Sequence, residues 1–299
     1  MRRTAAVCLC SLILQGSVVV ECTNGQMPIG SAVTRVLPNA NAKGMVPELR
    51  ANRSRPFPGT LLLCGGGIIP LSIREEFYKL GLGEEGSLVL IPTASPRSDS
   101  GDYTMWIDYW SPFRWKSIEV VHAQTREGAL NPALVAKMRG ATAVWFSGGE
   151  QQRLSDRYVG TPIETELHGL LARGGIVGGT SAGAAIASST MIASSRLIES
   201  GVEEPRFADG MQFLPGAIID QHFSQRKRHG RLTKAIAAFP NRIGLGIDES
   251  TGLIVTEEQS RVVGDGAVFV LNAGQEYQRL QAGDSLKNGK LDSSFANPK

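Results

Sequence analysis

The sequence predicts an α/β protein in which a mostly parallel sheet is covered by helices on both faces. Two observations support this fold class. First, short and continuous apolar runs such as "GTLLLC" at 59–64 and "SLVLIP" at 87–92 are typical of strands buried on both faces of a sheet. Second, segments with helical spacing of apolar residues alternate with these runs, an order that favours βαβ units.

The first half of the predicted domain consists of such alternating elements. Strands are predicted at 59–64, 87–95, 117–123, 142–147 and 176–180. Helices are predicted at 72–82, 131–141 and 162–175, and helix starts at 151 and 182. The helix at 131–141 has Asn131 as a favourable N-cap and Pro132 in its first turn, where proline is tolerated.

The pattern changes after residue 191, where shorter strands follow one another with few helices between them. These strands are predicted at 217–223, 243–250, 252–258, 261–274 and 276–283. We therefore expect an antiparallel extension at the edge of the sheet near the C-terminus. With 299 residues, 42% of them hydrophobic and 20% charged, the chain can bury a substantial core.

The N-terminus has the layout of an export signal. Arg2 and Arg3 precede an apolar stretch at 4–20, so we predict a signal at 1–23, a linker or loosely ordered arm at 24–58, and a single domain at 59–299. The protein is then secreted or periplasmic in a bacterium, or cytoplasmic if the segment is not a signal. Lipid anchoring through Cys22 is disfavoured because Glu21 precedes it.

Charge and cysteine content exclude several classes of protein. The net charge of +3 is too small to favour nucleic acid as a partner, and no stable membrane association is expected. The basic run "RKRHGR" at 226–231 is, taken alone, typical of a solvated helix face. Three of the four cysteines lie at or before residue 22, which leaves Cys64 and no internal disulfide.

The segment "GTSAG" at 179–183 fits the G-x-S-x-G turn that presents a nucleophilic serine between a strand and a helix. Its serine is Ser181, and a structural glycine turn is the alternative for a pentapeptide alone. The apolar strand before it and the small residues after it favour the catalytic interpretation. The N–H group of Ala182 would then point towards a developing oxyanion.

A serine nucleophile needs a base and an orienting acid. Among the histidines, His222 ends a predicted strand between polar neighbours, His122 also ends a strand, and His168 and His229 are expected to lie at the surface. The segment "GIDES" offers Asp248 and Glu249 as the acid. The resulting order of serine, histidine and acid differs from that of the α/β-hydrolases and argues against a lipase or esterase of that fold.

These residues carry a family resemblance. The segments "LLLCGGG", "WFSGGEQ", "GGTSAGA", "DQHFSQRKRHGRL" and "GLGIDEST" resemble, in this order and over about residues 59–274, the cyanophycinase branch of the peptidase E-like serine peptidases, family S51. The resemblance implies a flavodoxin-like fold similar to that of the class I glutamine amidotransferases. It also implies that no cofactor or metal is needed, and that a homodimer is one expected assembly.

The resemblance also implies roles for individual residues. Ser181 looks like the nucleophile, His222 the general base and Glu249 the third member of the triad. The Gly148-Gly149 turn is similar to the one that supplies the second oxyanion donor, Gly149, beside Ala182. The positions that match the family's substrate groove are Gln151, Asp220, Gln221, Arg226 and Arg231.

The implied substrate is cyanophycin, a polyaspartate with arginine on each β-carboxyl group, which the family cleaves to β-Asp-Arg dipeptides. The guanidinium groups of Arg226 and Arg231 suit its free carboxylates. Lys227, Arg228 and His229 depart from the family's usual "RGRLGR" pattern, and "GGGIIP" at 65–70 replaces acidic residues. The alternatives are a peptidase E-like dipeptidase for short Asp-X peptides and a non-catalytic binding protein that retains the fold.

Overall fold

The computed structural model describes residues 58–197 and 203–287. The chain divides into two units, Met1–Asn52 and Arg53–Lys299, and all described residues belong to the second. The predicted export signal and arm lie outside the described residues, apart from residue 58. Among the described helices, none has the length and hydropathy that crossing a membrane requires.

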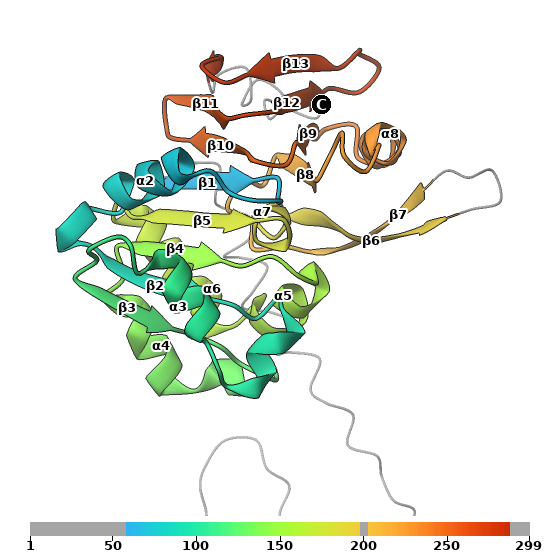
Figure 1. Cartoon of the computed structure of the whole chain (residues 1–299). Coiled ribbons are helices and arrows are strands. Elements are labelled where there is room, and N and C mark those ends of the chain that lie inside the picture. The colour runs from blue at the N-terminus through green and yellow to red at the C-terminus, as the bar shows by residue number, and fades with distance from the viewer. Residues whose placement is uncertain (1–57, 198–202, 288–299) are drawn as a thin grey trace, which may run out of the picture. The chain divides into compact units, whose positions relative to one another are not determined.

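The main sheet has eight strands in the order β14-β11-β10-β1-β5-β4-β2-β3 (Figure 1). Its parallel part comprises β1 (Thr60–Cys64), β2 (Ser87–Ile91), β3 (Ser117–Val120), β4 (Ala143–Phe146) and β5 (Ile176–Thr180). All five lie within the strands predicted from the apolar runs. The mostly parallel sheet is thus confirmed.

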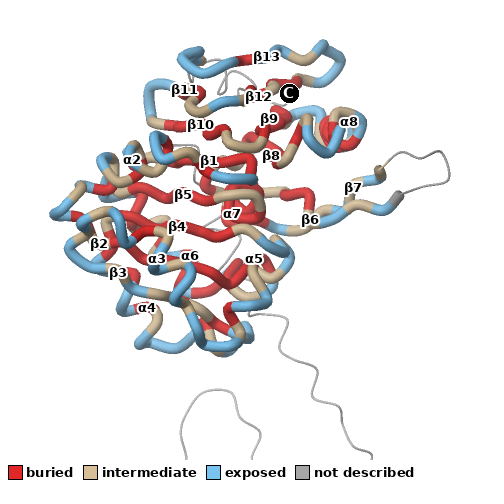
Figure 2. The backbone as a smooth tube through the Cα atoms, in the orientation of Figure 1, coloured by how far each residue is buried: buried red, intermediate tan, exposed pale blue. Residues whose placement is uncertain are grey.

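Helices cover both faces of this parallel part. Alternate residues of β1 enter opposite clusters, with Leu61 and Leu63 in one and Leu62 and Cys64 in the other. The first cluster is completed by the four helices α4 (Pro132–Arg139), α5 (Gln151–Tyr158), α6 (Pro162–Ala172) and α7 (Ala182–Ala185). The second is completed by α2 (Leu71–Leu80) and α3 (Thr104–Trp110). Burial on both faces explains why these strands are continuous apolar runs (Figure 2).

The C-terminal strands confirm the antiparallel extension and add a second sheet. In the main sheet, β10 (Thr251–Val255), β11 (Gln259–Gly264) and β14 (Ser285–Lys287) pair antiparallel beyond β1. The second sheet has the order β13-β12-β9-β8. Its strands are β8 (Ala217–Gln221), β9 (Ile243–Ile247), β12 (Ala267–Leu271) and β13 (Gln278–Gln281). Unlike the rest of the extension, β8 and β9 pair in parallel, because helix α8 (His229–Ala238) connects them.

A hairpin that the sequence pattern did not predict extends away from both sheets (Figure 1). Its strands β6 (Thr190–Leu197) and β7 (Glu203–Asp209) pair antiparallel, with an irregularity between Ile192 and Ser194. The base of β6 follows α7 directly, so the hairpin starts close to the turn that carries Ser181. The strand ends of β1, β4, β5 and β8 therefore meet β6 at one place.

Candidate active site

The turn between β5 and α7 holds Ser181 in a conformation that few non-glycine residues adopt, with φ 53° and ψ −110°. Small neighbours make this turn possible. A Cβ atom at Gly179 would lie 2.5 Å from the carbonyl oxygen of Gly183, and one at Gly183 would lie 2.6 Å from Phe146. The N–H of Ser181 donates to the carbonyl of Cys64 at 2.9 Å, which fixes the turn against the end of β1. The sequence motif therefore forms the strained strand-to-helix turn that it predicted.

His222 lies directly after β8, also at positive φ (48°). Its Nε2 atom is 2.9 Å from Ser181 Oγ, and its Nδ1 atom is 2.5 Å from Glu249 Oε1. The backbone N–H of His222 donates to the carbonyl of Gly65 at 2.7 Å, so the end of β1 also holds this residue. The three side chains thus form one hydrogen-bonded chain from carboxylate to imidazole to hydroxyl.

The glycines after β1 make room for the imidazole and the carboxylate. A Cβ atom at Gly66 would lie 2.2 Å from Cε1 of His222, and one at Gly67 would lie 2.9 Å from Cβ of Glu249. The carbonyl of Gly66 accepts a hydrogen bond from the N–H of Ser250. The sequence indicated only a tight turn here, because the packing partners lie far along the chain.

The two acids of "GIDES" have different surroundings. Asp248 is buried and accepts hydrogen bonds from the N–H groups of Ser224 (2.9 Å) and Ala267 (3.2 Å). Its carboxylate therefore joins the loop after β8 to the start of β12. The side chain of Glu249 reaches His222, and its backbone N–H donates a hydrogen bond to Gln225 Oε1 at 3.0 Å. Of the two acids, Glu249 is the one that contacts the imidazole.

Burial lowers the pKa of His222 below its ordinary value, and the hydrogen bond to Glu249 opposes this effect. Burial has the larger influence, so the imidazole is neutral at neutral pH. In the neutral form with a proton on Nδ1, that N–H donates to Glu249 and Nε2 accepts from the Ser181 hydroxyl. This arrangement is suited to proton removal from the hydroxyl.

Two backbone N–H groups near Ser181 in the chain or in the cavity have no backbone acceptor among the described residues. They belong to Ala182, the first residue of α7, and to Gly149, in the turn after β4. Gly149 has φ 143°, and a Cβ atom there would lie 2.3 Å from the carbonyl oxygen of Ala94. Only glycine fits this position. The neighbouring Gly148 packs near the serine, since a Cβ atom there would lie 3.4 Å from Ser181 Cβ, and Gly149 lines the same cavity as Ser181.

A cavity of about 480 Å³ opens above the Ser181 hydroxyl. It is lined by the turns after β1 and β4, the start of α5, the end of β5, β6, the end of β8 and the segment from there into α8. The lining residues are Gly66, Gly67, Gly148, Gly149, Gln151, Thr180, Ser181, Ala193, Ser194, Ser195, Gln221, His222, Arg226, Arg228 and Arg231. The structure thus brings the predicted residues Gly149, Gln151, Gln221, Arg226 and Arg231 to one cavity beside Ser181.

The two glutamines of the cavity are held by neighbouring groups. Gln151 Nε2 donates to the carbonyl of Ile192 at 2.8 Å, which ties the start of α5 to β6. Gln221 Oε1 accepts from Arg228 Nη1, and so does the Gln221 carbonyl. Both side chains are therefore oriented before any substrate binds.

Asp220 lies under the cavity and not in its lining. Its side chain is fully buried and accepts two hydrogen bonds from the guanidinium of Arg231, one of them at 2.9 Å from Nε, while Arg228 lies 3.5 Å away. Burial raises the pKa of Asp220, and the hydrogen bonds from Arg231 oppose this. Against the expectation of substrate contact, Asp220 orients the two arginines.

Arg231 is only 4% exposed, and it also reaches Ser195 Oγ at 3.3 Å and Glu203 at 3.4 Å. Its fork is thus occupied by groups of the protein. Arg226, in contrast, is exposed and forms no ion pair with the described residues. Arg226 is the cavity arginine with its full hydrogen-bonding capacity available.

In the sequence, Arg228 is one of three residues that depart from the family's usual "RGRLGR" pattern. In the structure it lines the cavity. Burial lowers its pKa to about 10, so it remains a cation at neutral pH. Its Nε atom is buried without a hydrogen-bond partner among the described residues. The sequence holds no local signal for this role, because the position of Arg228 is set by its hydrogen bonds to Gln221.

The other histidines are packed away from the serine. His122 is buried, with Nδ1 2.9 Å from Thr93 Oγ1 and Nε2 3.1 Å from Asp99. His168, expected at the surface, is half-buried and packs edge-on against Phe213. Neither lines the cavity, so His222 is the histidine available to Ser181 among the described residues.

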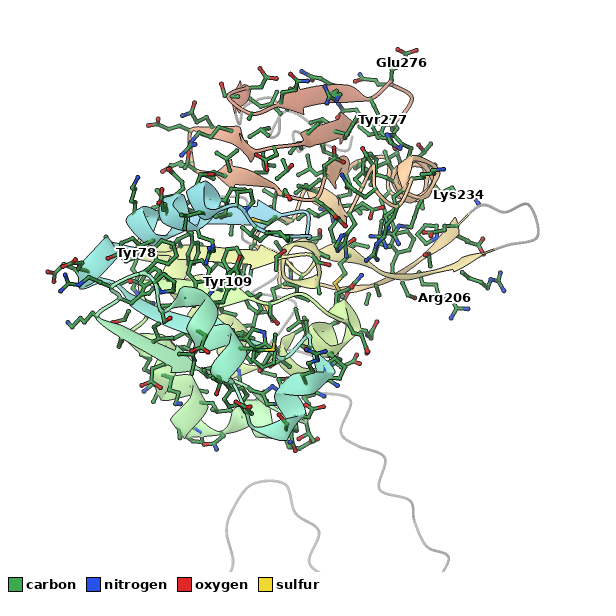
Figure 3. The ribbon with its side chains drawn as sticks, in the orientation of Figure 1. Tyr78, Tyr109, Arg206, Lys234, Glu276 and Tyr277 are labelled. Carbon is green, nitrogen blue, oxygen red and sulfur yellow. The ribbon has the colours of Figure 1, made fainter. Side chains whose placement is uncertain are left out.

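His229, expected to face solvent, lies instead in an aromatic cluster. Its ring centroid is 4.4 Å from that of Phe223 and 5.3 Å from those of Phe269 and Tyr277. The Tyr277 hydroxyl, labelled in Figure 3, donates to the His229 carbonyl at 2.8 Å. Because Phe223 follows His222 directly, this cluster anchors the segment that carries the imidazole.

The chain is similar to known peptidases in sequence and in fold. The model of peptidase family S51 matches residues 61–263. A cyanophycinase from Synechococcus elongatus is 33% identical over 220 residues, 72% of this chain and 68% of that protein. A cyanophycinase from a Nostoc species is 31% identical over 247 residues, 77% of this chain and 80% of that protein.

A solved structure of a peptidase from an acI-B1 Actinobacterium shares the fold, with a TM-score of 0.63 at 24% identity over 77% of this chain and 97% of that one. The family match covers more than half of the chain and includes the turn of Ser181 and the loops of His222 and Glu249. The chain belongs to peptidase family S51 and is a serine-type peptidase.

Proposed function

We propose that the protein is an exopeptidase that hydrolyses cyanophycin to β-Asp-Arg dipeptides through a Ser181, His222 and Glu249 triad and an acyl-enzyme. The observation that carries the proposal is the unbroken chain of contacts from Glu249 Oε1 to His222 and on to Ser181 Oγ, beside a cavity lined by arginines. Nucleophile, base and orienting acid are the parts that acyl transfer needs.

The first half of the reaction forms the acyl-enzyme. His222 Nε2 takes the proton of Ser181 as Oγ attacks the substrate carbonyl carbon. The N–H groups of Ala182 and Gly149 donate to the oxyanion that forms, since neither donates elsewhere among the described residues. His222 then passes the proton to the leaving amine, and the peptide bond breaks.

The second half repeats these steps with water. His222 takes a proton from the water molecule, hydroxide attacks the acyl carbon, and the Ser181 hydroxyl leaves with the proton returned. Glu249 keeps the imidazole in the tautomer with the proton on Nδ1 and stabilises the imidazolium in both halves.

The bond that is cut follows from the product. A dipeptide with arginine still attached to the β-carboxyl group is released only when the main-chain peptide bond of the polyaspartate breaks. The free carboxylates of such a substrate need cations in the cavity, and Arg226 is exposed and unpaired among the described residues. Cyanophycinases from two cyanobacterial genera are among the relatives, which supports this substrate.

The experiment is to incubate the purified protein with cyanophycin and resolve the products by mass. We expect β-Asp-Arg dipeptides, and no release with Ser181→Ala at equal protein concentration. Cleavage of short Asp-X dipeptides without any release from cyanophycin would favour the peptidase E-like alternative. Binding of either substrate without cleavage would favour the non-catalytic alternative.

A further inference from the structure

We infer that the active-site cavity recognises the α-carboxylate of the branch amino acid on a polyaspartate chain and leaves the side chain of that amino acid unrecognised. The enzyme then takes polyaspartates whose branches are arginine or another amino acid joined through its α-amino group. This inference rests on the proposed function. It concerns which part of the branch the protein binds.

The charge of the cavity lining carries the inference. The lining contains three arginines, Arg226, Arg228 and Arg231, and among the described residues that form it there is no aspartate or glutamate. A branch arginine presents a carboxylate and a guanidinium. The carboxylate finds cations in this lining, whereas the guanidinium finds like charge and no anionic acceptor.

Three acids near the lining, Asp220, Glu203 and Glu249, already have partners within the protein. Asp220 accepts two hydrogen bonds from Arg231, and Glu203 lies 3.4 Å from Arg231 and accepts from Ser195 Oγ at 2.8 Å. Glu249 is bonded to His222. Glu150 is exposed, follows Gly149 in the chain and is outside the lining. A guanidinium in the cavity would have to compete with Arg231 for Asp220 and Glu203, and with His222 for Glu249.

The edge of the cavity next to Gly67 is apolar. Ile68 follows Gly67 directly and is 85% exposed, and its carbonyl accepts a hydrogen bond from Ser250 Oγ at 2.8 Å. The backbone at this position is thus fixed while the side chain remains free to contact a substrate. An exposed aliphatic side chain thus follows the lining residue Gly67, and it can contact the methylene groups of an arginine branch as readily as those of a leucine branch.

The test compares short polyaspartates that carry one of three branches. These are arginine, leucine, and agmatine, which is arginine without its α-carboxylate. We expect kcat/KM for the leucine branch within about 3-fold of the arginine branch, and for the agmatine branch about 10- to 100-fold lower, because a charged hydrogen bond is lost. A leucine branch at least 10-fold poorer than arginine, or an agmatine branch as good as arginine, would overturn the inference.

Variants locate the two ends of the branch. Arg226→Gln should lower kcat/KM for the arginine branch and remove most of the difference from the agmatine branch; an unchanged difference contradicts the role of Arg226. Ile68→Glu should create a preference of about 3-fold or more for arginine over leucine branches. Leu82→Glu is the control, because Leu82 is another exposed aliphatic residue (61% exposed). It should leave the ratio of kcat/KM for arginine and leucine branches unchanged.

Glu150→Gln provides a separate check, since this exposed acid stands between the lining residues Gly149 and Gln151 and has no role in the triad. We expect less than a 3-fold change for the arginine branch; a larger loss confined to that branch would show that the guanidinium is bound. Failure to cleave any of the three substrates would contradict the proposed function itself. Cleavage with a strong arginine preference would contradict only the present inference.

Discussion

Replacing Gly66 by alanine should inactivate the enzyme without unfolding it. A Cβ atom there would lie 2.2 Å from Cε1, 2.5 Å from Nε2 and 2.8 Å from Nδ1 of His222, whereas ordinary contacts begin at 3.4 Å. The imidazole must therefore move by about 3.4 − 2.2 = 1.2 Å. This displacement breaks alignment with both Ser181 Oγ, now at 2.9 Å, and Glu249 Oε1, now at 2.5 Å.

A misplacement of about 1 Å costs roughly 10²-fold in rate, so we expect kcat to fall by at least that factor. Gly66 also has φ 107°, which adds about 1–3 kcal/mol of backbone strain for alanine. Gly174→Ala is the matched control, because Gly174 has φ 87° with no atom within 4 Å of an added Cβ. The two variants should lose similar thermal stability, and only Gly66→Ala should lose activity. A folded Gly66→Ala protein with more than half the wild-type kcat would refute the packing argument.

Three further predictions follow from single residues. Burial lowers the pKa of His222 and Glu249 partly restores it, so the acid limb of the pH profile of kcat/KM should lie below pH 6.5. Glu249→Gln should move this limb lower and reduce kcat about 10³- to 10⁴-fold. A limb above pH 6.5 in the wild-type protein would contradict this. Asp220→Asn should destabilise the fold by about 3–5 kcal/mol in denaturant unfolding, because Arg231 loses its buried partner; a stability within 1 kcal/mol of wild type is the opposing result. Burial raises the pKa of the Cys64 thiol, so alkylating reagents should leave it unmodified in the native protein; rapid labelling detected by mass would contradict its burial.

The parallel sheet could be predicted because its signal is local. The runs at Leu61–Leu63 and in β2, β4 and β5 are buried on both faces, and a continuous apolar segment of four or five residues leaves few alternatives. The strained turn at Ser181 was predictable for the same reason, since the glycines that permit it are its neighbours in sequence. The hairpin of β6 and β7 was missed because β6 has two adjacent serines and no period of two, and β7 contains Pro205.

Tertiary contacts explain what the sequence left open. Nothing in "CGGGII" indicates that Gly66 packs on a histidine ring from another sheet, because that contact joins segments far apart in the chain. The residues alone left Asp248 and Glu249 open as the acid, and only the family resemblance selected Glu249. In the structure, Asp248 accepts from the N–H groups of Ser224 and Ala267 instead. The place of Arg228 in the cavity lining was not predicted, because its burial and its contact with Gln221 depend on how β8 meets α8.

The central claim is that Ser181 is the nucleophile, and labelling with a fluorophosphonate tests it most directly. Digestion and mass analysis should locate the adduct on the Ser181 Oγ atom, with the label absent from Ser181→Ala and formed far more slowly in His222→Ala. An adduct on another residue, or equal labelling of Ser181→Ala, would contradict the account.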